Sequence, residues 1–249
     1  MIGFRVPSAM ISSSFLHQYF KLFDFIEIKI KNEYDFLSVQ KKLNSECLGK
    51  CSIHLPKRML YDEFEHNNAK RILECINNCE VYPVNIVMHF YGYENEIISK
   101  LRKLRKEVPK EVSICIENIQ TYSTKYIDEL EYVIKRLKKD NISICMDLGH
   151  LMYGGIKLGY TQIELTRMLK SKRSICQSIK EIHIHDFNVQ TDHIILSEGK
   201  LDRKSVCEIL QFLPIVPIII ETNVREAEKD GLMQVNWVKE ILNYGNTEN

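Results

Sequence analysis

Short runs of β-branched and other apolar residues alternate with longer charged segments of helical periodicity along the whole chain. The short runs predict eight strands: Ile2–Arg5, Phe25–Ile30, Cys51–Leu55, Asn85–His89, Ser113–Glu117, Ser143–Asp147, Glu181–His185 and Pro217–Glu221. The longer segments predict helices that connect parallel strands: Phe64–Glu80, Asn95–Lys106, Tyr126–Lys139, Gln162–Cys176, Arg203–Leu213 and Met233–Tyr244. This pattern predicts an α/β fold, a (β/α)8 TIM barrel. A doubly wound sheet of this size would use fewer strands and begin with a Gly-rich turn, which the sequence lacks.

The composition is that of an ordinary globular domain, and we expect residues 1–249 to form a single barrel. Lys and Arg number 34 against 33 Asp and Glu, so the net charge of +1 predicts no strong attraction to nucleic acid or to a membrane. Arg5 and Pro7 interrupt the N-terminal segment, which therefore does not read as a signal peptide or an anchor. The eight scattered cysteines favour reduced thiols and a cytoplasmic location.

Polar side chains gather where the predicted strands end. The active site of a (β/α)8 barrel is built at the C-terminal ends of its strands, so these side chains are expected to meet in one mouth. They are Arg5, Glu27 or Lys29, His54, His89, Glu117, Asp147 with His150, His183 with His185, and Glu221. Charges buried among apolar strands are costly unless they are paired or bind a metal. The pattern therefore predicts a divalent-metal site.

The candidate ligands divide into groups by strand. Three carboxylates and one imidazole come from the last four strands, and this mixed set suits zinc, manganese or cobalt: Glu117, Asp147, His183 and Glu221. His54 and His89 could hold a second ion that Glu117 bridges to the first. Such a pair of ions polarises a phosphoryl oxygen and activates water. His150 and His193 could bind a third ion or clamp the substrate.

Several of these residues have a second reading. A histidine at a strand end is often only hydrogen-bonded, and Asp147 could serve as a helix N-cap. Period-two alternation puts His183 and His185 on one face, where we favour His183 as the ligand and His185 or Asp186 as a supporting residue or substrate contact. Arg5 could bind a substrate phosphate or pair with Glu27.

Seven short motifs, taken in order, resemble the xylose-isomerase-like barrel superfamily that includes endonuclease IV. They are SIHLP (52–56), VMHFY (87–91), ICIEN (114–118), CMDLGHL (145–151), IHIHD (182–186), DHIILSEGKLD (192–202) and IIIET (218–222). The resemblance to endonuclease-like members implies three ions. The first would be held by His54, His89 and Glu117, the second by Glu117, Asp147, His183 and Glu221, and the third by His150 and His193. The family pattern has an aspartate where this chain has Thr191, with Asp192 beside it.

Two branches of this superfamily imply different reactions. The sugar isomerases and epimerases use one ion held by the equivalents of Glu117, Asp147, His183 and Glu221, and the two glutamates could move the proton. The additional histidines of this chain favour the hydrolytic branch. Within that branch, a DNA-repair endonuclease is less favoured because the chain is short and nearly neutral. A closer resemblance, through RVPS (5–8), SIHLP, SICMDLGHL (143–151) and DHIIL (192–196), is to cobamide-remodelling phosphodiesterases.

The leading hypothesis is a cytoplasmic, divalent-metal-dependent phosphodiesterase that cleaves the nucleotide loop of a cobamide. Glu117 and Glu221 are the expected catalytic residues, and Arg5, His185 and Asp186 the expected substrate contacts. Zinc is the favoured cofactor, with manganese or cobalt acceptable, at one to three ions per chain. A small-molecule phosphodiester or sugar is the expected partner, a corrinoid being favoured, with neither membrane nor nucleic acid. The alternatives are an isomerase or epimerase, an endonuclease, and a non-catalytic binding barrel.

Overall fold

The structure is a computed structural model that describes residues 1–43, 47, 49–93, 96–119, 123, 125–222 and 227–244. The start of the helix predicted at Asn95 lies outside these residues. Among the described residues, none of the helices is both long enough and apolar enough to cross a membrane.

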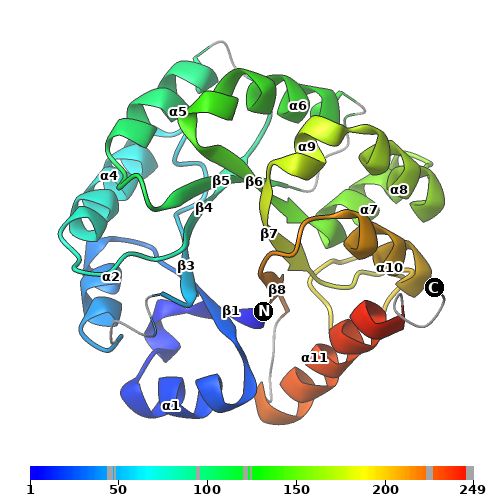
Figure 1. Ribbon diagram of the computed structural model, residues 1–249, viewed down its shortest axis with the longest axis horizontal. Coiled ribbons are helices and arrows are strands. Elements are labelled where there is room, and N and C mark those ends of the chain that lie inside the picture. Colours follow the sequence, from blue (N-terminus) through cyan, green and yellow to red (C-terminus); the bar gives the residue numbers. More distant parts are fainter. Residues whose placement is uncertain are drawn as a thin grey trace.

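Eight parallel strands form a closed barrel at the centre of the molecule (Figure 1). They are β1 (Ile2–Pro7), β2 (Phe25–Lys29), β3 (Cys51–His54), β4 (Asn85–Phe90), β5 (Ser113–Asn118), β6 (Ile142–Asp147), β7 (Ile179–Ile184) and β8 (Ile218–Ile220). Each strand pairs with its neighbour in the sequence, and β8 closes the barrel against β1. The predicted (β/α)8 barrel and its eight strands are thereby confirmed, with ends that differ by a few residues.

Helices form a ring around the barrel (Figure 1). They are α1 (Ser13–Leu22), α2 (Glu33–Gln40), α4 (Glu63–Asn77), α5 (Ile97–Lys106), α6 (Tyr126–Leu137), α7 (Leu148–Lys157), α8 (Gln162–Ser171), α9 (Arg173–Gln177), α10 (Arg203–Phe212) and α11 (Ala227–Tyr244), with short 3-10 turns η1 (Ser8–Met10) and η2 (Lys138–Asp140). The single helix predicted over Gln162–Cys176 is instead two helices, because Lys172 leaves the helical conformation with a ψ of 65°.

Helix α7 was not predicted from the sequence. Its three glycines and its high apolar content obscure the helical pattern in the sequence. Nearly all of α7 is buried, which explains why both of its faces are apolar. Helix α7 begins directly at the end of β6, where the side chain of Asp147 accepts a hydrogen bond from the His150 backbone N–H. Asp147 is therefore the N-cap, and His150 lies in the first turn.

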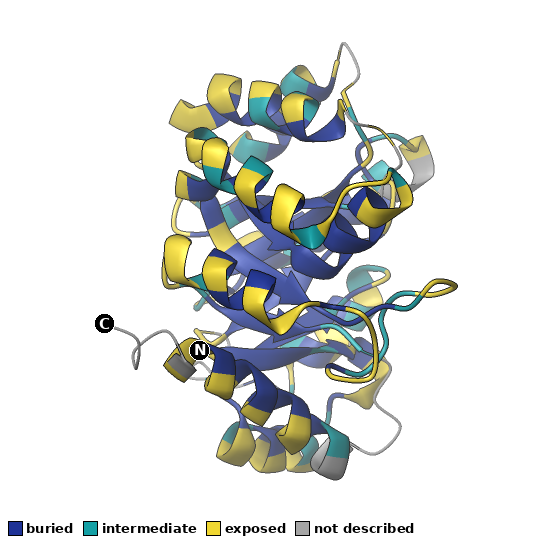
Figure 2. Ribbon diagram, turned by 90° about the vertical axis from the view of Figure 1, so that its right-hand side faces the viewer, coloured by how far each residue is buried: buried dark blue, intermediate teal, exposed yellow. Residues whose placement is uncertain are grey.

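The apolar core lies between the barrel and the helices. Figure 2 shows buried strands inside helices whose outward faces are exposed. On β4 and β5, the residues that contact this core are apolar: Ile86, Met88, Ile114 and Ile116. The alternate residues Val87 and Cys115, together with Cys145 of β6, form a separate small cluster, as expected if they face the barrel interior.

Above and below that small apolar layer, the alternate strand residues are polar although they are buried. Examples are Asn85 and His89 on β4, Glu117 on β5 and Glu181 and His183 on β7. Buried polar groups require partners, so the barrel interior holds a connected hydrogen-bond network. The register brings neighbouring members of this network together, with His89 opposite Glu117 and Asp147 opposite His183.

Candidate metal centre

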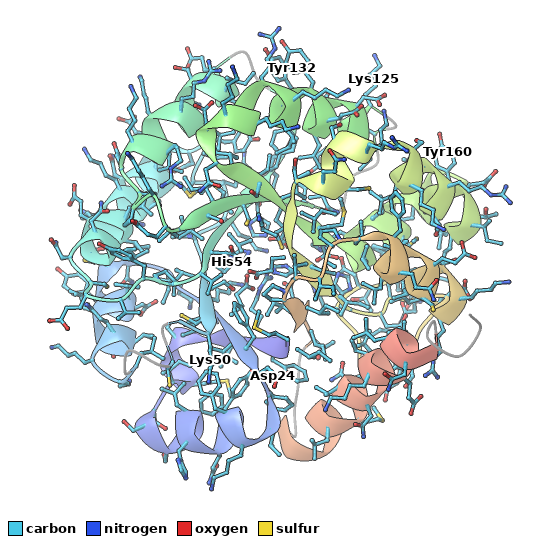
Figure 3. All side chains as sticks on the ribbon, in the orientation of Figure 1. Asp24, Lys50, His54, Lys125, Tyr132 and Tyr160 are labelled. Atoms are coloured by element: carbon cyan, nitrogen blue, oxygen red, sulfur yellow. The ribbon has the colours of Figure 1, made fainter. Side chains whose placement is uncertain are left out.

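Glu117 lies at the centre of the polar network, fully buried at the end of β5. One of its oxygens, Oε2, is 2.8 Å from His54 Nε2 and 3.6 Å from His89 Nε2. These three side chains offer ligand atoms that all lie within 4.8 Å of one another. Figure 3 shows His54 beside the centre of the barrel, whereas Tyr132 and Tyr160 lie near the periphery. The predicted grouping of His54, His89 and Glu117 is brought together by the fold.

The hydrogen bonding of His54 allows a tautomer that suits metal binding. His54 Nδ1 faces the Leu55 carbonyl oxygen at 3.0 Å, so a proton on Nδ1 leaves the Nε2 lone pair directed at Glu117. Burial lowers the pKa of His54 and lowers that of His89 to about 3. Both rings are therefore neutral near pH 7, which is the form that binds a metal.

The second oxygen of Glu117 belongs to the second predicted group. Oε1 is 3.1 Å from His183 Nδ1, which in turn lies 3.4 Å from Glu221 Oε2. Glu117, Asp147, His183 and Glu221 again offer ligand atoms within 4.8 Å of one another. Asp147 Oδ2 and Glu221 Oε2 are buried without a hydrogen-bond partner. Unsatisfied buried oxygens beside an imidazole nitrogen fit a divalent cation, so the residues present agree with the predicted ion.

Arg5 lies among the same side chains. Its guanidinium pairs with the carboxylates of Glu27 and Glu221, and Nη2 lies 3.5 Å from Glu117 Oε1 and 2.9 Å from His183 Nδ1. The predicted pairing with Glu27 is therefore present. Burial alone would raise the pKa of Glu117, but Arg5 and His183 outweigh it and hold that pKa well below its usual range. Glu117 is consequently ionised and able to act as a ligand.

Glu181 and Glu27 contact His183 through its other ring nitrogen, Nε2, and this role was not predicted from the sequence. His183 Nε2 is 3.1 Å from Glu27 Oε2 and 3.3 Å from Glu181 Oε1. Ser52 and Asn85 donate hydrogen bonds to the two oxygens of Glu181. These contacts hold the His183 ring with Nδ1 toward the candidate ligands. An acid two residues before His183 on the same strand face was the signal that could have revealed Glu181.

His183 also belongs to a cluster with Cys145 and Glu181. Burial raises the pKa of Cys145 well above its usual value, and burial likewise raises that of Glu181. These shifts favour a neutral thiol and oppose ionisation of Glu181, and both oxygens of Glu181 already accept hydrogen bonds from Ser52 and Asn85. We therefore assign Cys145 and Glu181 to the support of His183.

A further group lies on the other side of Asp147. His150, His185 and His193 place ligand atoms within 4.8 Å of one another, and the two Nε2 atoms of His150 and His193 are 3.3 Å apart. The two predicted histidines are thus brought together, and His185 joins them. His185 Nε2 also lies 3.3 Å from Asp147 Oδ1, which connects this group to the previous one.

Asp186 has a different place from the predicted substrate contact. It is buried, and its two oxygens accept hydrogen bonds from four backbone N–H groups of the following loop: Phe187, Ser197, Gly199 and Leu201. Because all four bonds go to the chain itself, the carboxylate orders the loop that carries His193. The period-two pattern did not indicate this role, since it depends on how the loop returns to the barrel.

The groups meet the solvent in a cavity of about 520 Å³ at the mouth of the barrel. Its lining includes Arg5, His89, His150, His193 and Glu221. Lys29 and Lys57 add positive charge to the lining, and Tyr91 adds an aromatic ring. A substrate in this cavity would therefore reach both the candidate ligands and Arg5.

A family model described as the xylose isomerase-like TIM barrel matches residues 38–241. The chain belongs to this family. A probable endonuclease 4 from Mycoplasmopsis synoviae (strain 53) is 26% identical over 123 residues, which are 45% of this chain and 44% of that protein. The matches span about half the length of the curated relatives.

Solved structures share the fold at low identity. Endonuclease IV from Thermus thermophilus aligns with a TM-score of 0.65 and 16% identity, covering 96% of this chain and 99% of that one. A sugar phosphate isomerase/epimerase from Parabacteroides distasonis ATCC 8503 aligns with a TM-score of 0.51 and 12% identity, covering 97% of this chain and 92% of that one. The same fold thus occurs in a protein named as an endonuclease and in one named as a sugar phosphate isomerase/epimerase.

Proposed function

We propose that this barrel is a divalent-metal-dependent phosphodiesterase. The observation that supports the proposal most directly is the position of Glu117, whose two oxygens face two adjoining ligand groups. A carboxylate shared in this way suits a pair of ions, and a pair of ions is typical of phosphoryl-transfer sites. An isomerase that uses one ion needs only the ligand group that contains His183, and metal binding would then not explain the positions of His54 and His89.

Bound divalent ions would supply Lewis acidity and water of lowered pKa near neutral pH. His54, His89 and Glu117 would hold one ion, and Glu117, Asp147, His183 and Glu221 the other. Zinc is our proposed metal, since mixed imidazole and carboxylate sets suit it, and manganese or cobalt are compatible.

The chain's own residues would orient the reaction. Glu221 is 14% exposed in its side chain and lines the cavity, so it can accept a proton from an attacking water. Glu117 is fully buried and would act mainly by holding both ions in position. Arg5 reaches the same cavity with a guanidinium that can donate two hydrogen bonds to the oxygens of a phosphate. His185 is buried, so it would act on the ligands rather than on the substrate.

For the substrate we propose the phosphodiester in the nucleotide loop of a cobamide. The proposal is supported by the motifs around Arg5, His54, Asp147 and His193 that resemble cobamide-remodelling phosphodiesterases. The near-neutral net charge of +1 argues against a duplex DNA substrate, which requires a basic track. A sugar isomerase or epimerase remains the second candidate, because the group of Glu117, Asp147, His183 and Glu221 could act with one ion.

The test combines metal content with hydrolysis. Protein purified without chelator or nickel resin is analysed by inductively coupled plasma mass spectrometry, alongside a His54→Ala, His89→Ala variant. The exposed His17 on α1 provides a matched control as His17→Ala. Hydrolysis of bis(p-nitrophenyl) phosphate and of a cobamide is measured on the same samples.

We expect at least two equivalents of metal in the wild type, with one lost and hydrolysis reduced by about 100-fold or more in the double variant. The His17→Ala protein should match the wild type. A single equivalent that is indifferent to His54 and His89, with no phosphodiester hydrolysis, would refute the phosphodiesterase. Activity of that protein on ketoses would then identify the isomerase.

A further inference from the structure

We infer that Tyr91 forms a subsite for a planar aromatic ring that the substrate carries beside its phosphate. The proposed phosphodiesterase function, on which this inference rests, supplies the phosphate, and the subsite adds the kind of group attached to it. Tyr91 directly follows β4, lines the mouth cavity together with His89, and keeps 38% of its surface exposed. An exposed aromatic side chain at the edge of a polar cavity is a surface on which a ligand ring can pack.

The Tyr91 ring lies next to the candidate metal centre. Its centroid is 5.9 Å from that of the His89 ring, and the two planes are inclined at 45°. His89 Nε2 in turn lies 3.6 Å from Glu117 Oε2. A phosphate held at this group would therefore have one of its ester substituents within reach of the Tyr91 ring.

Tyr61 holds Tyr91 in place through both its backbone and its ring. The Tyr61 hydroxyl accepts the Tyr91 N–H at 3.0 Å and donates to the Gly92 carbonyl oxygen at 2.9 Å. The two tyrosine rings meet edge to face, with centroids 5.5 Å apart and planes at 83°. Because these contacts exist before a ligand arrives, little conformational freedom is lost when a ring binds.

The chain turns sharply after Tyr91, which separates this ring from the next tyrosine. Gly92 has a φ of 117°, a conformation that favours glycine. Tyr93 then packs edge-on against Tyr132 of α6 at 5.2 Å, and its N–H donates to Glu129 Oε2 at 3.2 Å. Tyr132 lies near the periphery of the molecule (Figure 3). The turn therefore directs Tyr91 to the mouth and Tyr93 to the outer helices.

Positive charge surrounds the Tyr91 ring. The guanidinium carbon of Arg58 is 5.9 Å from the ring centroid, within the range of a cation–π contact. Arg58 has a φ of 61°, a left-handed conformation that is uncommon for a residue with a side chain. Lys57, the residue before it, lines the same cavity. Cations beside an aromatic surface favour a ring that is attached to an anion over a free hydrocarbon.

These features define a class of ligand, which is an aryl or nucleoside phosphate. Stacking tolerates different rings, because every aromatic ring offers a π-face. The Tyr91 subsite should therefore select for the presence of a ring beside the phosphate and select little among rings. In the nucleotide loop of a cobamide, the ring would be the base of the nucleotide.

The Tyr91 hydroxyl offers a competing role, since it could donate a hydrogen bond to a phosphate oxygen. Two substitutions separate the roles. Tyr91→Phe removes the hydroxyl and keeps the ring, whereas Tyr91→Leu keeps an apolar side chain and removes the aromatic face. Loss of a hydroxyl contact would weaken every phosphate ligand equally, whereas loss of stacking weakens only those ligands that carry a ring.

The test compares the dissociation constants of phenyl phosphate and methyl phosphate, measured by isothermal titration calorimetry on the zinc-loaded full chain. These probes share the phosphate and differ in the ring. We expect the wild type to bind phenyl phosphate about 10-fold more tightly. Tyr91→Leu should lose most of that preference, and Tyr91→Phe should keep it. Tyr34→Leu, at a 74% exposed tyrosine of α2, is the matched control and should also keep it.

An unchanged preference in Tyr91→Leu would overturn the subsite, and so would a wild type that binds the two probes alike or binds neither. Equal weakening of both probes in Tyr91→Phe would assign the residue to hydrogen bonding and overturn stacking. Hydrolysis of bis(p-nitrophenyl) phosphate is measured on the same proteins. A ring preference that depends on Tyr91, without any hydrolysis, would refute the phosphodiesterase while the subsite stands. Hydrolysis without that preference would refute the subsite alone.

Discussion

Replacing Asp186 by Asn should release the loop that carries His193 without disturbing the barrel. The carboxylate accepts the Phe187 and Leu201 N–H groups on Oδ1, both at 2.8 Å. Oδ2 accepts those of Ser197 and Gly199 at 3.2 and 2.8 Å. Asn keeps one carboxamide oxygen, which we expect to keep accepting the more buried N–H groups, those of Phe187 and Leu201. The NH2 group of Asn would then replace Oδ2, so the N–H groups of Ser197 and Gly199 would face a donor and lose their acceptor.

The expected magnitude follows from the lost bonds. A hydrogen bond to a charged group contributes about 1.5–3 kcal/mol, so the loss of two weakens the loop by about 3 kcal/mol or more. Since about 1.4 kcal/mol is tenfold in an equilibrium constant, local opening should become about 100-fold more frequent. The effect should be confined to the loop, because the Asp186 carboxylate accepts its hydrogen bonds from N–H groups of the loop and not from the strands.

Native-state amide hydrogen exchange, measured in EDTA to exclude any bound metal, checks this result. The amides of Ser197 and Gly199 should exchange about 100-fold faster in Asp186→Asn. The Leu196 N–H donates instead to Gln234 Oε1 at 3.1 Å and should change less. Asp192→Asn, in the same loop, is the matched control and should leave exchange unaltered. Unchanged exchange at Ser197 and Gly199 would refute the reasoning.

Two further substitutions test packing and charge. Ser174, Lys135 and Lys172 lower the pKa of Glu131 to about 2, so Glu131→Gln should cost about 1 kcal/mol at pH 7 by urea unfolding. The stabilisation by ionised Glu131 is fully present above the usual glutamate pKa and is lost as the pH falls through about 2. Equal destabilisation by Glu131→Gln at pH 7 and at pH 2 would therefore contradict this reasoning. Gly149→Ala should lower stability by about 1–3 kcal/mol, because its Cβ meets His185; a gain, as in an ordinary helix, would contradict this.

The barrel could be predicted because its signals are local and repeated. Each strand is a short apolar run such as Ile142–Asp147, and each is followed by a segment long enough to return to the same end of the sheet. Once the fold is a closed parallel barrel, the ends of its strands must meet. The convergence of His54, Glu117 and Glu221 therefore follows from topology, before any side-chain distance is known.

The remaining features depend on contacts that no local pattern contains. Asp186 looks like a strand-end acid, yet its role is set by a loop that returns to it over the next fifteen residues. Helix α7 was not among the predicted helices, because its three glycines and the apolar residues on both of its faces weaken the signal on which helix prediction relies. Arg5 was expected at the mouth, but its pairing with Glu221, from the opposite end of the chain, depends on closure of β1 against β8.

Asp147 shows why two interpretations that compete in a sequence can both hold in a structure. A strand-end aspartate can cap a helix or bind a metal, and the carboxylate has two oxygens for these tasks. Oδ1 accepts the His150 N–H at 2.7 Å, whereas Oδ2 is buried without a hydrogen-bond partner. The cap fixes the first turn of α7, and with it the His150 ring, relative to the oxygen that remains available. Capping therefore positions both Asp147, a candidate ligand in the group with Glu117, and His150, which belongs to the group with His185 and His193.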